Sequence, residues 1–262
     1  HVAAAEAPYK TYSNVSVTTV GVWTRTDISI PRGAMVALMA EGECWNVKQQ
    51  KRRLDPTACV RFKIGEKGVG RRLTRLYISQ HVAVAKSPGE GRLSFNIAPF
   101  LKERRNWQAN ISATILVWEK GKADKIESDI QNLISAHPDD KRYRALLFPL
   151  AGCFTQTGEY MHAEKILKEL RESAGNQGRE GLIALNQSAE NEKWLRRYDR
   201  VAAYSQESLD LARRGGNKGF QGGALLSLSE AKWHLGQREA AIRLAEEALQ
   251  MSAGMRLGSS SL

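Results

Sequence analysis

The sequence predicts a chain of two domains, an antiparallel β-sandwich or jelly roll followed by an array of paired α-helices. In the first part, apolar residues alternate with polar ones or form short runs between Gly, Pro, Asn and Asp, as in strands. After Gly121 they recur at helical spacing. The charge changes at the same point, with 19 Lys and Arg against 9 Asp and Glu in residues 1–120, and 20 against 19 in the remainder. We therefore expect one domain at 1–119 and another at 120–262.

The overall composition is that of a folded protein. The chain has 262 residues, of which 42% are hydrophobic and 26% charged, which excludes wholesale disorder. The longest apolar window, 111–118, is too short to span a bilayer, so no transmembrane segment is expected. The net charge of +11 lies almost entirely in the first domain. Only that domain is expected to attract anionic partners.

Short strands account for the first domain. We expect seven or eight of them, at 15–20, 27–30, 34–40, 59–64, 73–85 (as one strand or two), 93–97 and 111–118. The strand at 111–118 is apolar on both faces, which is typical of a central strand. This pattern indicates a sandwich of about 110 residues.

Helices account for the second domain. Ile126, Ile130, Leu133 and Ile134 share one helix face, and Pro138 ends that helix. Pro149 lies inside the next expected helix, where it should bend the helix because proline lacks the backbone N–H. The following segments are expected to form about three helix pairs.

The helical part is self-similar. Leu150-Ala151-x-x-Phe154 precedes Gly158-x-Tyr160-x-x-Ala163, and parts of this pattern return around Val201 and Ala241. The equivalent positions Ile126, Ala163, Val201 and Ala241 are separated by 37, 38 and 40 residues. The pattern resembles the tetratricopeptide repeat (TPR). The resemblance implies a TPR solenoid whose first helices line a concave face that binds a protein or peptide partner.

The repeat register places a mixed polar and aromatic set on this concave partner groove. Its members are Thr155, Gln156, Asn186, Glu190, Lys193, Trp194, Glu230, Trp233 and His234. Two tryptophans among charged residues suit an extended peptide, because a few aromatic anchors carry most binding energy. The alternative is that Trp194 and Trp233 pack between repeats.

The first domain also resembles a known family. The segments 21–36, Glu41-Gly42 and 91–97 resemble galactose-binding-like jelly rolls, with bacterial calcium-dependent galactophilic lectins as the nearest type. The resemblance implies a lectin-like jelly roll and sugar binding. In that family the last of these segments runs into an Asn-Asp pair that holds calcium, whereas this chain has Ala98-Pro99 and a basic loop. We therefore expect no metal and no cofactor.

Basic clusters in the first domain are candidates for binding an anionic ligand or a glycan. The candidate residues comprise eight basic residues and one tryptophan: Lys51, Arg52, Arg53, Arg71, Arg72, Arg75, Arg104, Arg105 and Trp107. If the loops gather at one end of the sandwich, these residues form one site. The alternative is a solvated surface with the aromatic residue in the core. A nucleic-acid partner is unlikely, because the sequence contains no recognised nucleic-acid module.

Cys44 and Cys59 are candidates for a disulfide, since they bracket a short loop within the sandwich. That pairing requires export, so a periplasmic or secreted location is slightly favoured. Two free thiols in a cytoplasmic protein are the alternative.

The function expected from these features is recognition. The five histidines are scattered, and neither H-E-x-x-H nor G-x-S-x-G occurs, so we do not expect an enzyme. We expect a non-catalytic scaffold that binds a protein partner through the solenoid, with the sandwich as an accessory domain. The alternatives are a carbohydrate-binding protein, or the regulatory N-terminal part of a larger TPR-containing protease or signalling enzyme.

Overall fold

The computed structural model shows strands followed by helices, which confirms the predicted order of β and α structure. It describes residues 9–17, 23–47, 53–54, 60–65, 71–72, 74–77, 80–87, 89–97, 107–119, 122–174 and 178–258. The chain forms two compact units, residues 1–153 and 154–262. Among the described residues, the first helix begins at Ala123, as expected, but the division between units lies later in the chain than the predicted boundary at 119/120.

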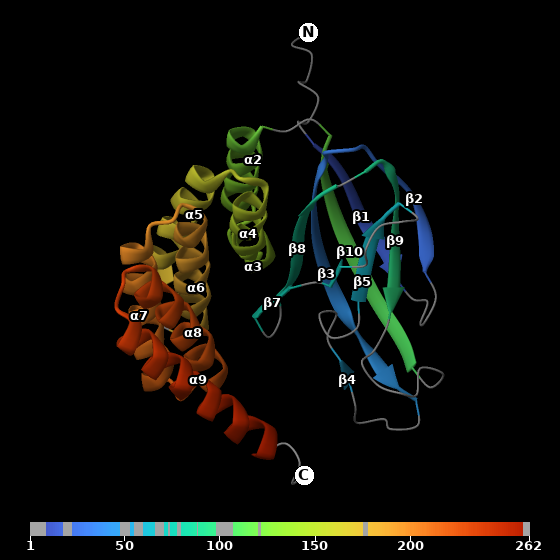
Figure 1. Cartoon of the computed structure of the whole chain (residues 1–262). Helices are drawn as coiled ribbons and strands as arrows, with labels where there is room; N and C mark the ends of the chain where they lie inside the picture. Colours follow the sequence, from blue (N-terminus) through green and yellow to red (C-terminus); the bar gives the residue numbers. More distant parts are fainter. Residues whose placement is uncertain are drawn as a thin grey trace. The chain divides into compact units, whose positions relative to one another are not determined.

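Two antiparallel sheets form the sandwich in the first unit (Figure 1). The six-stranded sheet has the order β1 (Lys10–Val17), β10 (Trp107–Trp118), β3 (Met35–Asn46), β8 (Gln80–Lys86) and β7 (Thr74–Tyr77), with β4 (Arg53–Leu54) on the far end of β3. The four-stranded sheet has the order β2 (Thr24–Ile30), β9 (Gly91–Ile97), β5 (Val60–Ile64) and β6 (Arg71–Arg72).

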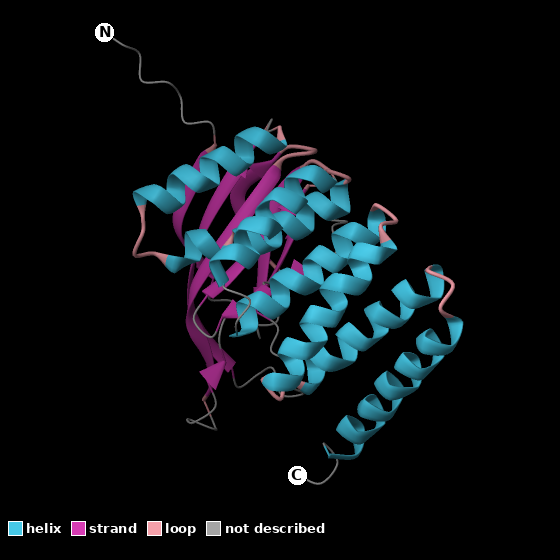
Figure 2. Ribbon diagram, turned by 90° about the vertical axis from the view of Figure 1, so that its left-hand side faces the viewer, coloured by secondary structure: helices cyan, strands magenta, loops and turns pink. Residues whose placement is uncertain are grey.

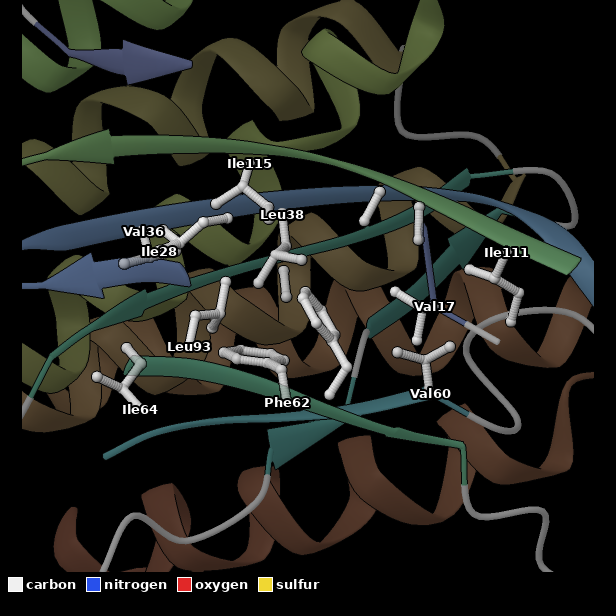
Figure 3. Packing of buried hydrophobic residues seen from close by; sticks show 14 of the residues in the cluster. Val17, Ile28, Val36, Leu38, Val60, Phe62, Ile64, Leu93, Ile111 and Ile115 are labelled. Carbon is white, nitrogen blue, oxygen red and sulfur yellow. The ribbon is translucent and has the colours of Figure 1, made fainter. Parts of the chain in front are cut away.

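The core of the sandwich lies between the two sheets. Leu38 and Ile115 extend into it from the six-stranded sheet, and Phe62 and Leu93 from the four-stranded sheet (Figure 3). The burial of β5 alternates residue by residue, because successive side chains of a strand point to opposite faces. In β5 the predicted period of two therefore corresponds to one buried face.

The six-stranded sheet is also apolar on its outer face. Met35, Met39, Leu116 and Trp118 alternate with core residues and are nonetheless at most 5% exposed. The helices α2 (Ala123–Ala136), α3 (Lys141–Ala145) and α4 (Leu147–Thr157) cover this face (Figure 1). Trp118 Nε1 donates to Asp129 Oδ2 of α2 at 2.9 Å, and Cys153 Sγ of α4 lies 3.5 Å from Met35 Sδ. These contacts explain why the first unit extends to Cys153.

The connection from α3 to α4 differs from the bent helix that the sequence predicts at Pro149. Leu146 separates the two helices, and α4 begins at Leu147. Pro149 therefore lies in the first turn of α4, where a missing N–H leaves no helical hydrogen bond unmade. Asp140 caps α3 by accepting a hydrogen bond from the Arg142 backbone N–H at 3.0 Å.

The second unit continues with helices that pack each against the next. They are α5 (Tyr160–Ala174), α6 (Gly178–Trp194), α7 (Tyr198–Arg214), α8 (Lys218–His234) and α9 (Arg238–Gly258). Figure 2 shows α8 and α9 side by side near the end marked C.

The turns within the helix pairs share one backbone geometry. Gly158, Arg196 and Gly236 precede α5, α7 and α9 and have φ of 85°, 58° and 77°. The second turn has no glycine, and Arg196 adopts this left-handed conformation in its place, at a cost in free energy because of its Cβ. Gly178 at the start of α6 and Gly216 before α8 have φ of 66° and 64°, so the same geometry recurs at the turns between pairs.

Candidate functional site

Three large apolar side chains are exposed on neighbouring helices of the second unit. Trp194 on α6 is 58% exposed, and Leu226 and Trp233 on α8 are 59% and 53% exposed. Lys193 Nζ of α6 lies 2.9 Å from Glu230 Oε2 of α8, so one ion pair joins the two helices, and it lies 3.7 Å from Glu190 Oε2 on its own helix. We define the α6–α8 face by six residues: Glu190, Lys193, Trp194, Leu226, Glu230 and Trp233.

Helical spacing places the face residues of each helix on the same side of that helix. Leu226, Glu230 and Trp233 follow one another at intervals of four and three residues, which places them on one side of α8. Glu190 and Trp194 are four residues apart on α6. The side-chain hydrogen bond to Glu230 is the largest cause of the raised pKa of Lys193. Two carboxylates accompany the Lys193 ammonium, and the Arg238 guanidinium of α9 lies 5.6 Å from the centroid of the Trp233 ring, so charges of both signs border this face.

Not every residue predicted for the groove belongs to this face. Thr155 is only 6% exposed and donates to Asn191 Oδ1 at 3.0 Å, so it packs inside the unit. The prediction of Thr155 as a groove residue was therefore wrong. The repeat register gives the place of a residue on its helix, but it does not show which neighbouring helix packs against that residue. Asn186 accepts a hydrogen bond from Ser208 of α7 at 2.6 Å, and Gln156 is exposed near the end of α4.

His234 also has a neighbour. Its ring stacks on Tyr198, with ring centroids 3.9 Å apart and planes at 11°. It therefore contributes to packing between helix pairs, although the side chain remains exposed. The structure brings together Glu190, Lys193, Trp194, Glu230 and Trp233 of the predicted set.

Sequence reasoning missed Leu226. This residue follows Asn186 by 40 residues, the same interval that separates Glu190 from Glu230. The 40-residue repeat interval therefore relates Leu226 to a predicted groove residue, although a leucine in a helix is usually a core residue.

A charged cluster joins α5, α6 and α7. Glu192 is 1% exposed, and its carboxylate contacts Arg200 at 2.9 Å and Arg197 at 3.5 Å. Arg200 also lies 2.9 Å from Glu164. Burial raises the pKa of Glu192, and the charge of Arg200 opposes that shift. Since these four charged groups pair with one another, the cluster holds the helices together. Glu164 and Arg200 also line an open pocket of about 710 Å³.

The first unit contains a pocket on the outer face of the four-stranded sheet. It has a volume of about 460 Å³ and is lined by Trp23, Arg25, Lys63, Gly65, Glu90, Gly91, Arg92 and Ser94. Lys63 Nζ lies 4.8 Å from the centroid of the Trp23 ring. We call it the Trp23 pocket. The sequence analysis did not identify it, since its residues come from segments up to about seventy positions apart.

The basic clusters predicted as one anion site lie on different sheets where the structure describes them. Arg53 and Arg75 belong to strands of the six-stranded sheet, and Arg71 and Arg72 form β6 of the other. Trp107 is 4% exposed in the sandwich core, so its assignment to the anion site was wrong. Lys51, Arg52, Arg104 and Arg105 lie outside the described residues.

The cysteine prediction is tested only in part. Cys44 is buried on β3 as a free thiol, which argues against its predicted pairing, and Cys59 lies outside the described residues. Across the described ranges, no three His, Cys, Asp or Glu residues are grouped so that they could hold a metal ion. No helix in the described part of the chain has the length and apolarity needed to cross a membrane.

Among known proteins, similarity to this chain was found only in solved structures. No family model matches the sequence. No curated protein matches it. Among solved structures, the chain is similar to BtubC (BKLC) from P. vanneervenii, with 15% identity and a TM-score of 0.43. The match covers 51% of this chain and 58% of BtubC.

Proposed function

We propose that the chain is a non-catalytic recognition protein whose helical unit, a TPR-like solenoid, binds an extended segment of a protein partner across the α6–α8 face. The observation that carries this proposal is the exposure of Trp194, Leu226 and Trp233, each above 50%, on adjacent helices. Single exposed apolar residues are common, whereas several gathered on one face mark an interaction site. Tryptophans are also the residues that most often dominate binding energy.

The charges beside the aromatic residues favour a particular partner. Glu190 and Glu230 outnumber Lys193 between α6 and α8, and the Arg238 guanidinium lies over the Trp233 ring. A segment with apolar anchors and a Lys or Arg opposite the two carboxylates would complement them, because opposite charges at the rim guide association and select the partner. The exposed fractions of the two tryptophans weigh against the alternative that they only fill space between repeats.

The sandwich, which we interpret as a jelly roll, is the accessory domain in this proposal. A regulatory part of a larger protease or signalling enzyme would use the α6–α8 face in the same way. The two alternatives therefore share one test of binding.

Selection of peptides against the full chain, followed by titration of a synthetic peptide, tests the proposal. The selected peptides should carry an apolar anchor next to Lys or Arg. Trp233→Ala and Leu226→Ala should each weaken binding about tenfold or more, as expected for truncated anchors. The matched control is Leu249→Ala, because Leu249 of α9 is 70% exposed and outside this face. The control should leave the affinity within about twofold.

Two results would contradict the proposal. One is a selected peptide that binds both variants as tightly as the unchanged protein. The other is a loss with Leu249→Ala equal to the loss with Trp233→Ala. Circular dichroism of each variant separates lost binding from lost folding.

A further inference from the structure

The Trp23 pocket is built on the strands of the four-stranded sheet. Arg25 of β2 pairs with Ser94 of β9, and Ser94 pairs with Lys63 of β5, so these three residues form one row across the sheet. The next row on the same face runs from Asn96 to Arg61 and then to Arg72 of β6. Side chains on paired strands are held in fixed relation, which suits a preformed ligand site.

The glycines at one end of the pocket bring two backbones into contact. A Cβ on Gly91 would lie 2.4 Å from Cα of Gly65, a distance that neither chain could accommodate. Gly65 itself has φ of 73°. Two residues without side chains therefore let the two backbone segments meet at this wall, where the Gly65 N–H donates to the Arg92 carbonyl oxygen at 3.0 Å.

Charge and shape indicate the class of ligand. The lining contains Arg25, Lys63 and Arg92 against one carboxylate, Glu90, so the pocket favours an anion. Arginine binds carboxylates through two parallel hydrogen bonds. The volume of about 460 Å³ falls in the range of small-molecule sites and suits one or two sugar rings. Lys63 Nζ lies 4.8 Å from the centroid of the Trp23 ring, and the part of the ring that Lys63 leaves open adds an apolar surface for the C–H face of a sugar.

The carboxylates beside the pocket favour a ligand that carries hydroxyl groups as well as a negative charge. Glu90 lines the pocket, and Asp27 lies 3.5 Å from Arg92 beside it. A carboxylate accepts hydrogen bonds, which sugar hydroxyls can donate and ionised phosphates cannot. We propose that the Trp23 pocket binds a short acidic saccharide, with a sugar carboxylate at Arg25 and Lys63 and a hydroxyl at Glu90. This proposal is independent of the α6–α8 face.

Calorimetric titration of the full chain with trigalacturonic acid tests the ligand class. Its methyl ester is the matched neutral ligand, and an oligothymidylate represents nucleic acid. The acid should bind, the ester should bind about tenfold more weakly, and added salt should weaken the acid alone. Equal affinity for the ester would overturn the assignment of a carboxylate site. Tighter binding of the oligothymidylate, or no binding of the acid at millimolar concentration, would overturn the proposal.

Variants locate the site. Arg25→Gln and Lys63→Gln should each weaken binding of the acid about tenfold, as expected for loss of a charge-assisted hydrogen bond. Arg32→Gln is the matched control, because Arg32 is exposed in the turn after β2 and does not line the pocket. Unchanged affinity in both pocket variants, with normal circular dichroism, would contradict the placement of the ligand.

Discussion

The two sheets of the sandwich differ in their outer faces. On the six-stranded sheet, Met35, Leu116 and Trp118 face outward and are buried under α2, α3 and α4. On the four-stranded sheet, the outward positions of β2, β5 and β9 hold Arg25, Lys63 and Ser94. The first face is a packing surface and the second is available to a ligand. The chemistry of the outward residues therefore indicates which face of a sandwich another layer covers.

The largest expected difference between the two faces concerns their tryptophans. Trp118→Ala should lower the free energy of unfolding by about 3–5 kcal/mol, because it empties a site that is 1% exposed beneath a helix. Trp23→Ala should have a much smaller effect, since Trp23 is half-buried at an open pocket. Urea denaturation of the unchanged protein and of the two variants measures both losses in the free energy of unfolding. Equal losses would show that the four-stranded sheet also uses its outer face for packing.

The hydrogen bond under α2 should have the next largest effect. Asp129→Leu leaves the buried indole N–H of Trp118 without its acceptor and should cost about 1–3 kcal/mol. Asp129→Asn keeps an acceptor oxygen and should retain most of the stability. Ser128→Leu, at an exposed position of α2, is the control and should change stability by less than about 0.5 kcal/mol. A similar loss for Ser128→Leu would assign the effect to the added leucine.

The ion pairs of α3 should make the stability of the covered face depend on pH. A side-chain hydrogen bond from Arg142 lowers the pKa of Asp140, and Arg142 also reaches Glu41 of β3 at 2.8 Å. Since the folded pKa lies below the unfolded value, this stabilisation is present above about pH 4 and is lost as the pH falls through the folded pKa. Asp140→Asn should lower stability at pH 7 and converge with the unchanged protein in acid. Denaturation curves that stay parallel from pH 7 to pH 3 would contradict this role.

The smallest effect is expected on the open face. Arg92 pairs with Asp27 at 3.5 Å, but both side chains are exposed. Exposed ion pairs contribute little, because water and salt screen them. Arg92→Gln should therefore leave Tm unchanged in a thermal melt. A clear drop in Tm would mean that this face is structurally organised like the helix-covered one.

Several features of the fold could be predicted because they depend on neighbouring residues. The run at 111–118 was predicted to be apolar on both faces, and β10 is buried on both only from Ile115 to Trp118, by the core on one side and by helices on the other. The prediction assigned this to a central strand without naming what covers the second face. The change of period near 120 was confirmed as the start of the helices, but period does not show which helices pack on the sheet.

The candidate sites show the same limit. Trp194 and Trp233 were placed by the repeat register, because helical spacing fixes the side of a helix on which a residue lies. Thr155 satisfied the same register and is buried, since Asn191 lies against it. The Trp23 pocket joins residues from β2, β5 and β9, whose pairing no local pattern reveals.

The sequence by itself determined the order of strands and helices and the side of α6 and α8 on which the tryptophans lie. Those properties follow from hydrophobic period and backbone geometry, which act over a few residues. Only the tertiary structure decided that α2 to α4 belong to the sandwich and that Arg25, Lys63 and Trp23 share a pocket. Strand pairing and helix packing join distant segments, and their energies depend on the complete set of buried surfaces.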